Sequence, residues 1–249
     1  MSMRRGETKG MIELLPGFWL ASHPTLTHPW DANAYFIPGE EPTLIDCGGA
    51  LGYPALKRAL AQRGVQPRDI RQVIATHGHW DHLSGMAALR AESDARLSIH
   101  AADRPQVETG DYDLTSAFLY GEPFPSLAVD GTLEDGALLD VNGFRVAIHH
   151  TPGHSPGSVC LVVERAGTVL LVAGDTLWAG FHPRVRSNIE DWQRSLDKLI
   201  GLRFDVLTTG HGPPHLIDHA SEVVREARLQ LGVYYHPWFK PFYETFHYS

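Results

Sequence analysis

The order of elements that this sequence predicts is that of an α/β protein, with two similar sheets packed face to face and helices outside. Strands followed by a helix, strand, helix, strand order appear in the first half, and the second half repeats this order. No linker rich in glycine and serine separates the halves, so we expect one domain over residues 1–249 with a shared core. At 249 residues, 43% of them hydrophobic, the chain is long enough to build such a core.

Short apolar runs bounded by turn residues predict the strands of the first half, which are residues 12–15, 18–20, 34–37, 44–45, 73–75 and 97–100. Helices are predicted at 54–64, where Pro54 suits the first turn and Gly64 ends the pattern, and at 83–89. Residues 101–137 are rich in Asp, Glu, Gly and Pro, which indicates an irregular excursion with helix only near 115–119. Long irregular segments are often functional, so this one is expected near the mouth of a site.

The second half is predicted to contain strands at 144–149, 158–163, 168–172 and 206–207, and helices at 189–200 and 216–231. Asn188 is a good N-cap for the first of these helices, and Asp191 complements the positive end of its dipole. Apolar residues, among them Trp192 and Leu196, recur on one face of that helix, which we expect to pack on a sheet.

The composition argues against several classes of function. The net charge of −8 and the pI near 6.0 come without a basic stripe, so no nucleic-acid partner is expected. No apolar run reaches the ~18 residues that suggest a membrane span, and no apolar stretch follows the charged amino terminus. We therefore expect no membrane association and a cytoplasmic location. Cys47 and Cys160 lie in apolar, strand-like runs and are expected as buried thiols.

Three imidazoles and a carboxylate are concentrated in the sequence Thr-His-Gly-His-Trp-Asp-His at residues 76–82. Imidazole and carboxylate are good ligands for Zn²⁺, and imidazole also suits Fe. The motif lies at the carboxyl end of a predicted strand, where open α/β sheets place their ligand sites. If the loop is extended, His77, His79 and Asp81 point to one side and His82 to the other, so that one loop could serve two metals.

Three further loops, each just past a predicted strand, carry single candidate ligands. They are His154 within Thr-Pro-Gly-His-Ser-Pro-Gly-Ser, Asp175 within Gly-Asp-Thr-Leu, and His211 within Gly-His-Gly. Proline and glycine around the two histidines favour a rigid backbone, as a ligand loop requires. The joint occurrence of seven candidate ligands at four strand ends predicts a metal centre. Asp46, which also follows a strand, either opens an Asx turn or orients a ligand histidine.

These motifs, in this order, resemble those of the metallo-beta-lactamase superfamily over about residues 12–214. The resemblance implies a four-layer αββα sandwich with the site along one edge, and two divalent metal ions, for which Zn²⁺ is expected and Fe or Mn are the alternatives. By motif position it implies one metal held by His77, His79 and His154, a second held by Asp81, His82 and His211, and Asp175 between the two. Asp46 matches the family's acidic residue after an early strand.

The chemistry expected of such a centre is hydrolysis of a small-molecule acyl substrate. Two cations about 3.5–4 Å apart can share a hydroxide, because a metal can lower the pKa of bound water from 15.7 to roughly 7. We expect the hydroxide to attack a carbonyl whose oxygen one metal polarises, while Asp81 acts as the catalytic carboxylate that orients the nucleophile. No serine or cysteine nucleophile is then needed.

Gly-Asp-Thr-Leu, together with the tryptophan inside the first motif, resembles the glyoxalase II branch, which hydrolyses a glutathione thioester. Two departures count against that substrate. Only residues 212–249 follow His211, where that branch has a glutathione-binding region, and its Gly-rich, Arg-ending stretch is replaced by residues 178–184. We therefore expect a related thioester or another ester, with Trp178, Phe181 and Arg184 as candidate substrate contacts.

Two alternatives remain open. The lactonase branch shares the seven ligands but usually carries a tyrosine three residues past the bridging aspartate, where this chain has Trp178. Persulfide dioxygenases also resemble the pattern and use one iron with fewer of these ligands. True β-lactamases lack this full set of seven, so antibiotic hydrolysis is not expected as the main role.

The carboxy-terminal tail, residues 233–249, carries eight aromatic side chains. An exposed apolar segment of this kind usually marks an interface. We expect the tail to pack on its own domain, to wall the substrate pocket, or to join a partner subunit in a homodimer.

Overall fold

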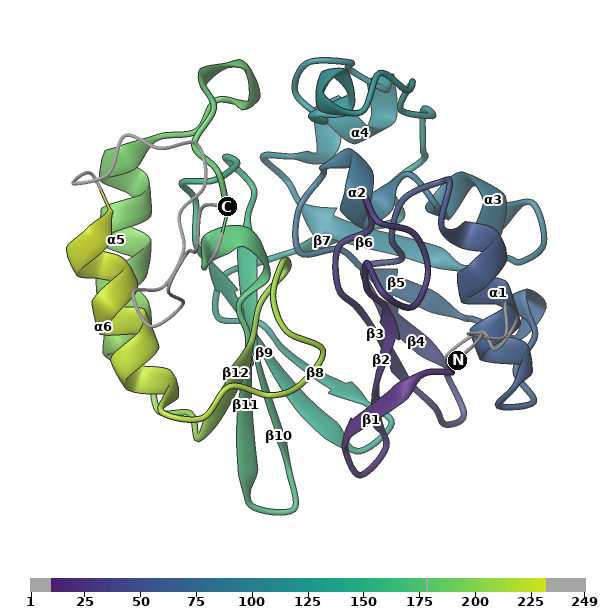
Figure 1. The fold of residues 1–249 in the computed structure, drawn as a ribbon, viewed down its shortest axis with the longest axis horizontal. Coiled ribbons are helices and arrows are strands. Elements are labelled where there is room, and N and C mark those ends of the chain that lie inside the picture. The colour runs from purple at the N-terminus through teal and green to yellow at the C-terminus, as the bar shows by residue number, and fades with distance from the viewer. Residues whose placement is uncertain (1–9, 178, 232–249) are drawn as a thin grey trace, which may run out of the picture.

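Two sheets lie face to face in the computed structural model, which describes residues 10–177 and 179–231 (Figure 1). The first sheet has the strand order β1-β2-β3-β4-β5-β6-β7. Its strands are β1 Ile12–Leu15, β2 Phe18–Ser22, β3 Ala34–Ile37, β4 Thr43–Ile45, β5 Gln72–Ile74, β6 Arg96–His100 and β7 Gly131–Leu133. From β4 to β7 neighbouring strands run parallel, and from β1 to β4 they alternate in direction.

The second sheet has the order β12-β11-β10-β9-β8. Its strands are β8 Leu138–Val141, β9 Phe144–His150, β10 Val159–Arg165, β11 Thr168–Val172 and β12 Val206–Thr208. Only β11 and β12 pair in parallel here. The two sheets therefore differ in strand number and in direction, and are less similar than the repeated order of elements predicted.

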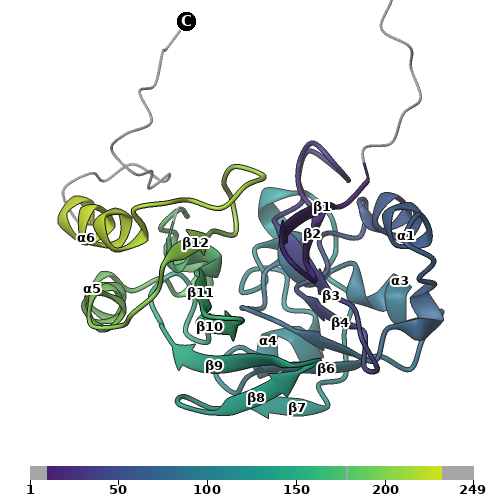
Figure 2. The same ribbon diagram turned by 90° about the horizontal axis from the view of Figure 1, so that it is seen from below.

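Helices cover the outer face of each sheet, as the two perpendicular views show (Figures 1 and 2). The first sheet carries α1 Tyr53–Ala61, α2 Trp80–Leu83, α3 Met86–Arg90 and α4 Arg104–Thr109 in its crossovers, and the second carries α5 Ile189–Ile200 and α6 Ala220–Gln230. Single 3₁₀ turns lie at 67–69, 117–119, 174–176 and 183–185. None of the helices in the described ranges is long and apolar enough to cross a membrane.

Three apolar layers hold this arrangement together. The central layer joins the inner faces of the two sheets, with Phe18 and Ile74 from one and Ile148 and Leu161 from the other. A second layer lies between the first sheet and its helices, and a third lies between the second sheet and α5 and α6. Buried apolar area is the main stabilising term in such a fold. The layers confirm the predicted αββα sandwich.

Most predicted elements agree with the structure to within a few residues, and Asn188 caps α5 by accepting from the Asp191 amide at 2.9 Å. The predicted helix at 83–89 is interrupted between α2 and α3. A Cβ at Gly85 would lie 3.0 Å from the Gly48 carbonyl oxygen, so the chain here packs directly on the loop after β4. The last helix begins at Ala220 and not at 216, because Ile217 pairs with Leu207 instead.

The segment 101–137 is more ordered than its composition indicated. It contains α4 and β7, which the sequence prediction missed, and the 3₁₀ turn Ala117–Leu119 near the predicted helical stretch. The expectation that this segment lies near the mouth of a site agrees with the structure, since Ser116, Leu119 and Tyr120 line a cavity that also contains His79 and Asp81. Cys47 and Cys160 are buried free thiols, as predicted.

Candidate metal centre

The four ligand loops meet at one end of the sandwich, where backbone hydrogen bonds join them both between the two sheets and within the second sheet. The amide of Val159 donates to the carbonyl of Thr76 at 2.8 Å, and the amide of Gly210 donates to that of Gly174 at 2.9 Å. Gly210 must be glycine for this approach, since a Cβ there would lie 1.9 Å from Asp175 Oδ1. Each loop thus places its ligand against the ligands of the other sheet.

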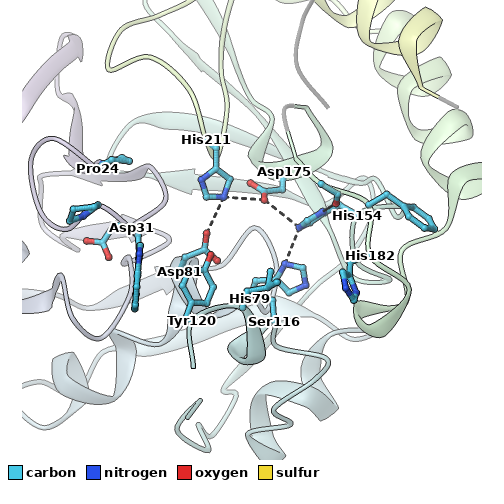
Figure 3. A pocket seen from close by; sticks show the side chains of 15 residues that line it. Pro24, Asp31, His79, Asp81, Ser116, Tyr120, His154, Asp175, His182 and His211 are labelled. Carbon is cyan, nitrogen blue, oxygen red and sulfur yellow. Dashed lines mark hydrogen bonds and ion pairs between the residues drawn. The ribbon is translucent and has the colours of Figure 1, made fainter. Parts of the chain in front are cut away.

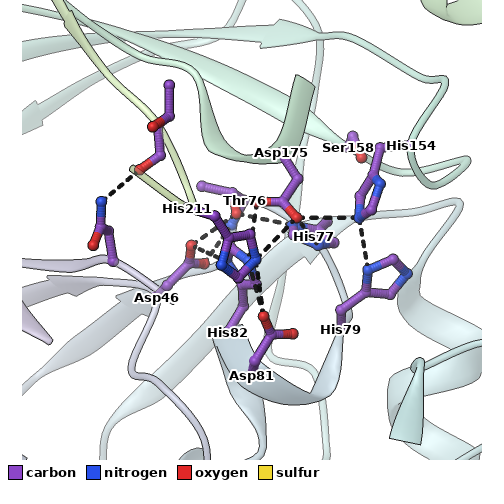
Figure 4. Close-up of polar contacts among 12 residues, drawn as sticks. Asp46, Thr76, His77, His79, Asp81, His82, His154, Ser158, Asp175 and His211 are labelled. Atoms are coloured by element: carbon purple, nitrogen blue, oxygen red, sulfur yellow. Dashed lines mark hydrogen bonds and ion pairs between the residues drawn. The ribbon is translucent and has the colours of Figure 1, made fainter. Parts of the chain in front are cut away.

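The structure brings all seven predicted ligands into one buried cluster (Figure 4). Three subsets have ligand atoms within 4.8 Å of one another: His77, His79 and His154; His77, His82 and Asp175; and Asp81, His82 and His211. Asp175 lies between the first and last subsets, with Oδ2 at 3.3 Å from both His154 Nε2 and His211 Nε2. Two of the three subsets have the same members as the two metal sites that the family resemblance implied, and the third combines His77, His82 and Asp175.

The sequence analysis expected Asp81 to point to the same side as His77 and His79 if the loop is extended, and the structure differs from this expectation. The helix α2 begins at Trp80, so the backbone coils after His79 and Asp81 no longer points with His77 and His79. Instead Asp81 Oδ2 lies 3.0 Å from His211 Nε2. Because α2 begins inside the motif, His77 and His79 lie with His154, whereas Asp81 and His82 lie with His211.

Hydrogen bonds fix the protonation of the imidazoles so that their lone pairs face one another. His154 Nδ1 donates to the Gly180 carbonyl at 3.0 Å, and His82 Nδ1 donates to Asp46 Oδ2 at 2.9 Å. His77 Nδ1 donates to Thr76 Oγ1 at 3.1 Å, because the hydroxyl proton of Thr76 is given to Asp46. In the neutral rings of His77 and His82 the Nε2 atom is therefore a free acceptor, which is the state a metal requires. His154 Nε2 is an acceptor as well, and His79 Nδ1 donates to it at 2.9 Å.

Four buried side-chain atoms of the cluster have no hydrogen-bond partner in the described part of the chain. They are His77 Nε2, His79 Nε2, His82 Nε2 and Asp175 Oδ1, all buried. His82 Nε2 and Asp175 Oδ1 lie 3.2 Å apart without forming a hydrogen bond. Unpaired buried polar atoms are costly and call for an explanation such as a missing ion. Imidazole nitrogen and carboxylate oxygen are also the donors that Zn²⁺ takes, so the residues fit a divalent metal.

Charge in the cluster is strongly coupled. Burial and the neighbouring imidazoles hold the pKa of His77 and of His79 well below the usual value. Burial alone would lower the pKa of His211 as well, but Asp175 and Asp81 raise it to about 10. The pKa of His82 is raised in the same way, by Asp175, Asp81 and Asp46. The carboxylates of Asp46, Asp81 and Asp175 therefore stabilise positive charge on or near His82 and His211, whether it comes from protons or from metal ions.

Asp46 does more than shape a turn. Its Oδ1 accepts from the Thr76 amide at 2.7 Å, and its Oδ2 accepts from the Thr76 hydroxyl at 2.8 Å and from His82 Nδ1. Of the two interpretations that the sequence left open, the geometry supports the carboxylate that orients a histidine.

Asp103 is a structural residue that the sequence analysis did not find. It accepts from the amides of Gly78 and Gly157 and from the hydroxyl of Ser155, at 3.0, 2.7 and 2.7 Å. It therefore ties the loop that carries His79 to the loop that carries His154. Its position after the strand at 97–100 was the available signal, since the other acidic site residues also follow strands.

A cavity of about 270 Å³ opens over the cluster (Figure 3). His79, Asp81, His154, Asp175 and His211 form its floor, and the rest of its lining is Pro24, Pro29, Trp30, Asp31, Ser116, Leu119, Tyr120, Gly180, Phe181 and His182. Among the predicted substrate contacts, Phe181 lies in this lining. Arg184 does not, and it is ion-paired with Asp113. Trp178 and the aromatic tail lie outside the described residues.

Tyr120 is the second residue that the sequence analysis missed. Its ring stacks on Trp80, with centroids 4.6 Å apart, and it lines the cavity together with Asp81. Burial and the nearby carboxylates raise the pKa of Tyr120, so the phenol stays protonated. It places a neutral donor beside the carboxylate that lies closest to His211.

Buried imidazoles and carboxylates with free lone pairs, at the edge of an αββα sandwich, define a metal-dependent hydrolase. The family model of the metallo-beta-lactamase superfamily matches residues 28–211. The chain belongs to this superfamily. It is 29% identical over 190 residues to the Bacillus subtilis protein named "Probable metallo-hydrolase YqgX", covering 74% of this chain and 87% of that protein.

Other similar proteins agree with the family. "Metallo-beta-lactamase domain-containing protein 1" of Xenopus laevis is 30% identical over 204 residues, covering 80% of this chain and 78% of its own length. A solved structure of a metallo-beta-lactamase from Cronobacter sakazakii, a variant in its HARLDQ motif, has a TM-score of 0.69 at 28% identity, with 82% and 81% of the two chains covered. MIM-1 from Novosphingobium pentaromativorans has a TM-score of 0.73 at 20% identity, with 90% and 88% covered, which shows the shared fold.

Proposed function

We propose that this protein hydrolyses a thioester or another ester of a small molecule, with two divalent cations at the cluster. The observation that carries the proposal is the cluster of seven candidate ligands, six of them buried, in which Asp175 lies at 3.3 Å from both His154 and His211. Zn²⁺ suits this set of donors, and Fe and Mn are the alternatives. When bound, such cations supply an activated water molecule and polarise a substrate carbonyl.

The chain's own residues would hold and orient the reactants. His77, His79 and His154 would hold one cation, and Asp81, His82 and His211 the other, with Asp175 shared. Asp81 is well suited to orient the attacking water, because it lies in the cavity floor and is ionised. Although burial would raise the pKa of Asp81, His82 and His211 lower it to about 2.

Tyr120 is proposed to donate a hydrogen bond to Asp81 and so to keep this carboxylate in position. A hydrogen bond from a neutral phenol to a carboxylate is directional and holds the acceptor in one rotamer. This donor comes from the segment 101–137 and not from the position three residues past Asp175, where the lactonase branch has its tyrosine. A thioester or ester thus remains favoured over a lactone, and both use the same site.

Elemental analysis of protein purified without added metal, followed by a panel of thioesters, esters and lactones, tests this proposal. We expect close to two equivalents of metal per chain and turnover of a thioester or an ester. His79→Ala and Asp81→Ala should abolish turnover, while His215→Ala, an exposed histidine outside the cluster, should not.

Two outcomes would contradict the hydrolase. A single equivalent of iron, with oxygen consumed in the presence of a persulfide, would assign the site to the dioxygenase alternative. A fully metallated protein that cleaves no member of the panel would leave a metal-binding protein without this activity.

A further inference from the structure

Part of the cavity lining is apolar, and we name its residues the apolar wall. It consists of Pro24, Pro29, Trp30, Leu119, Tyr120 and Phe181. These residues come from three separate segments: the loop between β2 and β3, the turn near Ala117–Leu119, and the loop that follows Asp175. Three segments that are far apart in the sequence thus contribute apolar side chains to the same cavity.

Large side chains of this wall stay partly exposed to water. Trp30, Leu119 and Phe181 are 44%, 59% and 37% exposed. Trp30 is held in place by aromatic contacts, with its ring centroid 5.7 Å from that of Tyr120. Clustered exposed apolar side chains commonly mark a binding surface. Here they border the proposed catalytic metals.

Among the described residues, the cavity lining has no lysine or arginine that could pair with a charged substrate group away from the metals. Asp31 instead adds a carboxylate to this lining. Arg184, the nearest candidate in sequence, is paired with Asp113 and lies 3.9 Å over the ring of Phe118. A carboxylate buried against this wall would lose its hydration without gaining a counter-charge.

From these observations we infer that the substrate is an uncharged ester or thioester with an aromatic or bulky aliphatic group, and that this group packs on the apolar wall. The inference rests on the proposed function and narrows its substrate class. A volume of about 270 Å³ lies just below the range of about 300–1,000 Å³ common for ligand sites, which suits one such group. A thioester of glutathione, which carries carboxylates, fits this lining poorly.

A matched pair of thioesters tests the inference. The S-benzyl thioester of butanoic acid and its para-carboxybenzyl counterpart differ only in a charge remote from the reacting carbonyl. With zinc-loaded protein, release of the thiol is followed with a chromogenic disulfide. We expect kcat/KM to be higher for the neutral thioester by about 10-fold or more, because only the charged one must desolvate a carboxylate.

Two lysine variants locate the effect. Leu119→Lys places a cation in the wall, and the exposure of Leu119 allows this without disturbing the core. It should lower the preference for the neutral thioester by about 10-fold. Leu138→Lys is the matched control, because Leu138 is 58% exposed but lies in β8 and outside the lining. It should leave the preference unchanged.

Binding of benzyl ethyl sulfide, which cannot be hydrolysed, gives a readout that does not depend on turnover. It is measured by tryptophan fluorescence with wild type and Trp30→Ala, and we expect at least about 10-fold weaker binding to the variant. Equal or better cleavage of the charged thioester, an unchanged preference in Leu119→Lys, or no binding of the sulfide would overturn the inference. Binding of the sulfide without cleavage of either thioester would instead refute the proposed hydrolysis of thioesters and leave the esters of the panel as its test.

Discussion

Replacing Asp46 with asparagine should weaken metal binding, although Asp46 itself lies outside the predicted ligand set. The carboxylate accepts three hydrogen bonds, from the Thr76 amide, the Thr76 hydroxyl and His82 Nδ1. An asparagine can keep its oxygen toward the Thr76 amide, but its NH₂ group then faces the other two donors. His82 would have to move its proton to Nε2, which is the atom that faces Asp175.

The size of this effect follows from the hydrogen bonds. Loss of the partner that orients a ligand histidine typically costs 10- to 100-fold in metal affinity, or about 1.4–2.8 kcal/mol. In the variant, the NH₂ group of the asparagine would face the Thr76 hydroxyl and His82 Nδ1, which are also donors. These unsatisfied contacts should lower the free energy of unfolding of the metal-free protein by about 1–3 kcal/mol, the cost of an unsatisfied buried group.

Zinc affinity in competition with a chromophoric chelator is the measurement, with metal-free unfolding in urea beside it. Asp31→Asn is the matched control, since Asp31 and Asp46 are equally buried and Asp31 bonds to no histidine. Equal zinc affinity of Asp46→Asn and wild type, in a folded protein, would refute the idea that Asp46 fixes the proton of His82.

Three further predictions concern protons and Tyr120. Burial raises the pKa of Asp31 to about 6 from an ordinary value of 3.8, so its contribution to stability is present below about pH 4 and is lost as the pH rises through 6. Urea unfolding of the metal-free protein measures this effect. Over this pH range the free energy of unfolding of wild type should fall by up to about 3 kcal/mol relative to that of Asp31→Asn, and the same pH dependence in both proteins would contradict the prediction. Zinc loading at pH 7.5 should release about two protons per chain, because the pKa values of His82 and His211 are raised and both imidazoles carry a proton that the metal displaces. Calorimetry in buffers of different ionisation enthalpy measures this number. The His211→Ala variant should release about one proton fewer, and release of no proton by wild type would contradict the prediction. Tyr120→Phe should reduce kcat by about 10- to 100-fold with unchanged zinc content, since a hydrogen bond to a charged group contributes about 1.5–3 kcal/mol, and an unchanged kcat would remove its proposed role.

The ligand cluster could be predicted from sequence because each ligand is set in a short local pattern at a strand end. Glycine and proline around His154 and His211 restrict the backbone within a few residues, and the αββα sandwich brings these strand ends together. Asp81 shows the limit of this reasoning. Its direction depends on where α2 begins, and the alternation of an extended loop does not contain that information.

The apolar wall and Tyr120 could not be predicted, because they depend on contacts between residues far apart in the chain. Trp30 and Tyr120 meet with ring centroids 5.7 Å apart, although 90 positions separate them in the sequence. The same holds for β7 and for β8. β7 is only Gly131–Leu133, and β8 alternates exposed and partly buried residues, so their pairing with β6 and β9 decides their structure.

Assembly of the site is coupled to assembly of the sandwich. Asp46 and Asp81 come from the first sheet and Asp175 from the second, and all three are buried, so closing the two sheets concentrates negative charge. Protons on His82 and His211 balance part of this charge in the metal-free protein, and metal ions would replace them. A ligand that binds only the folded chain stabilises it in proportion to the logarithm of its concentration. The same carboxylates that orient the histidines therefore make the closed sandwich depend on the cations it would hold.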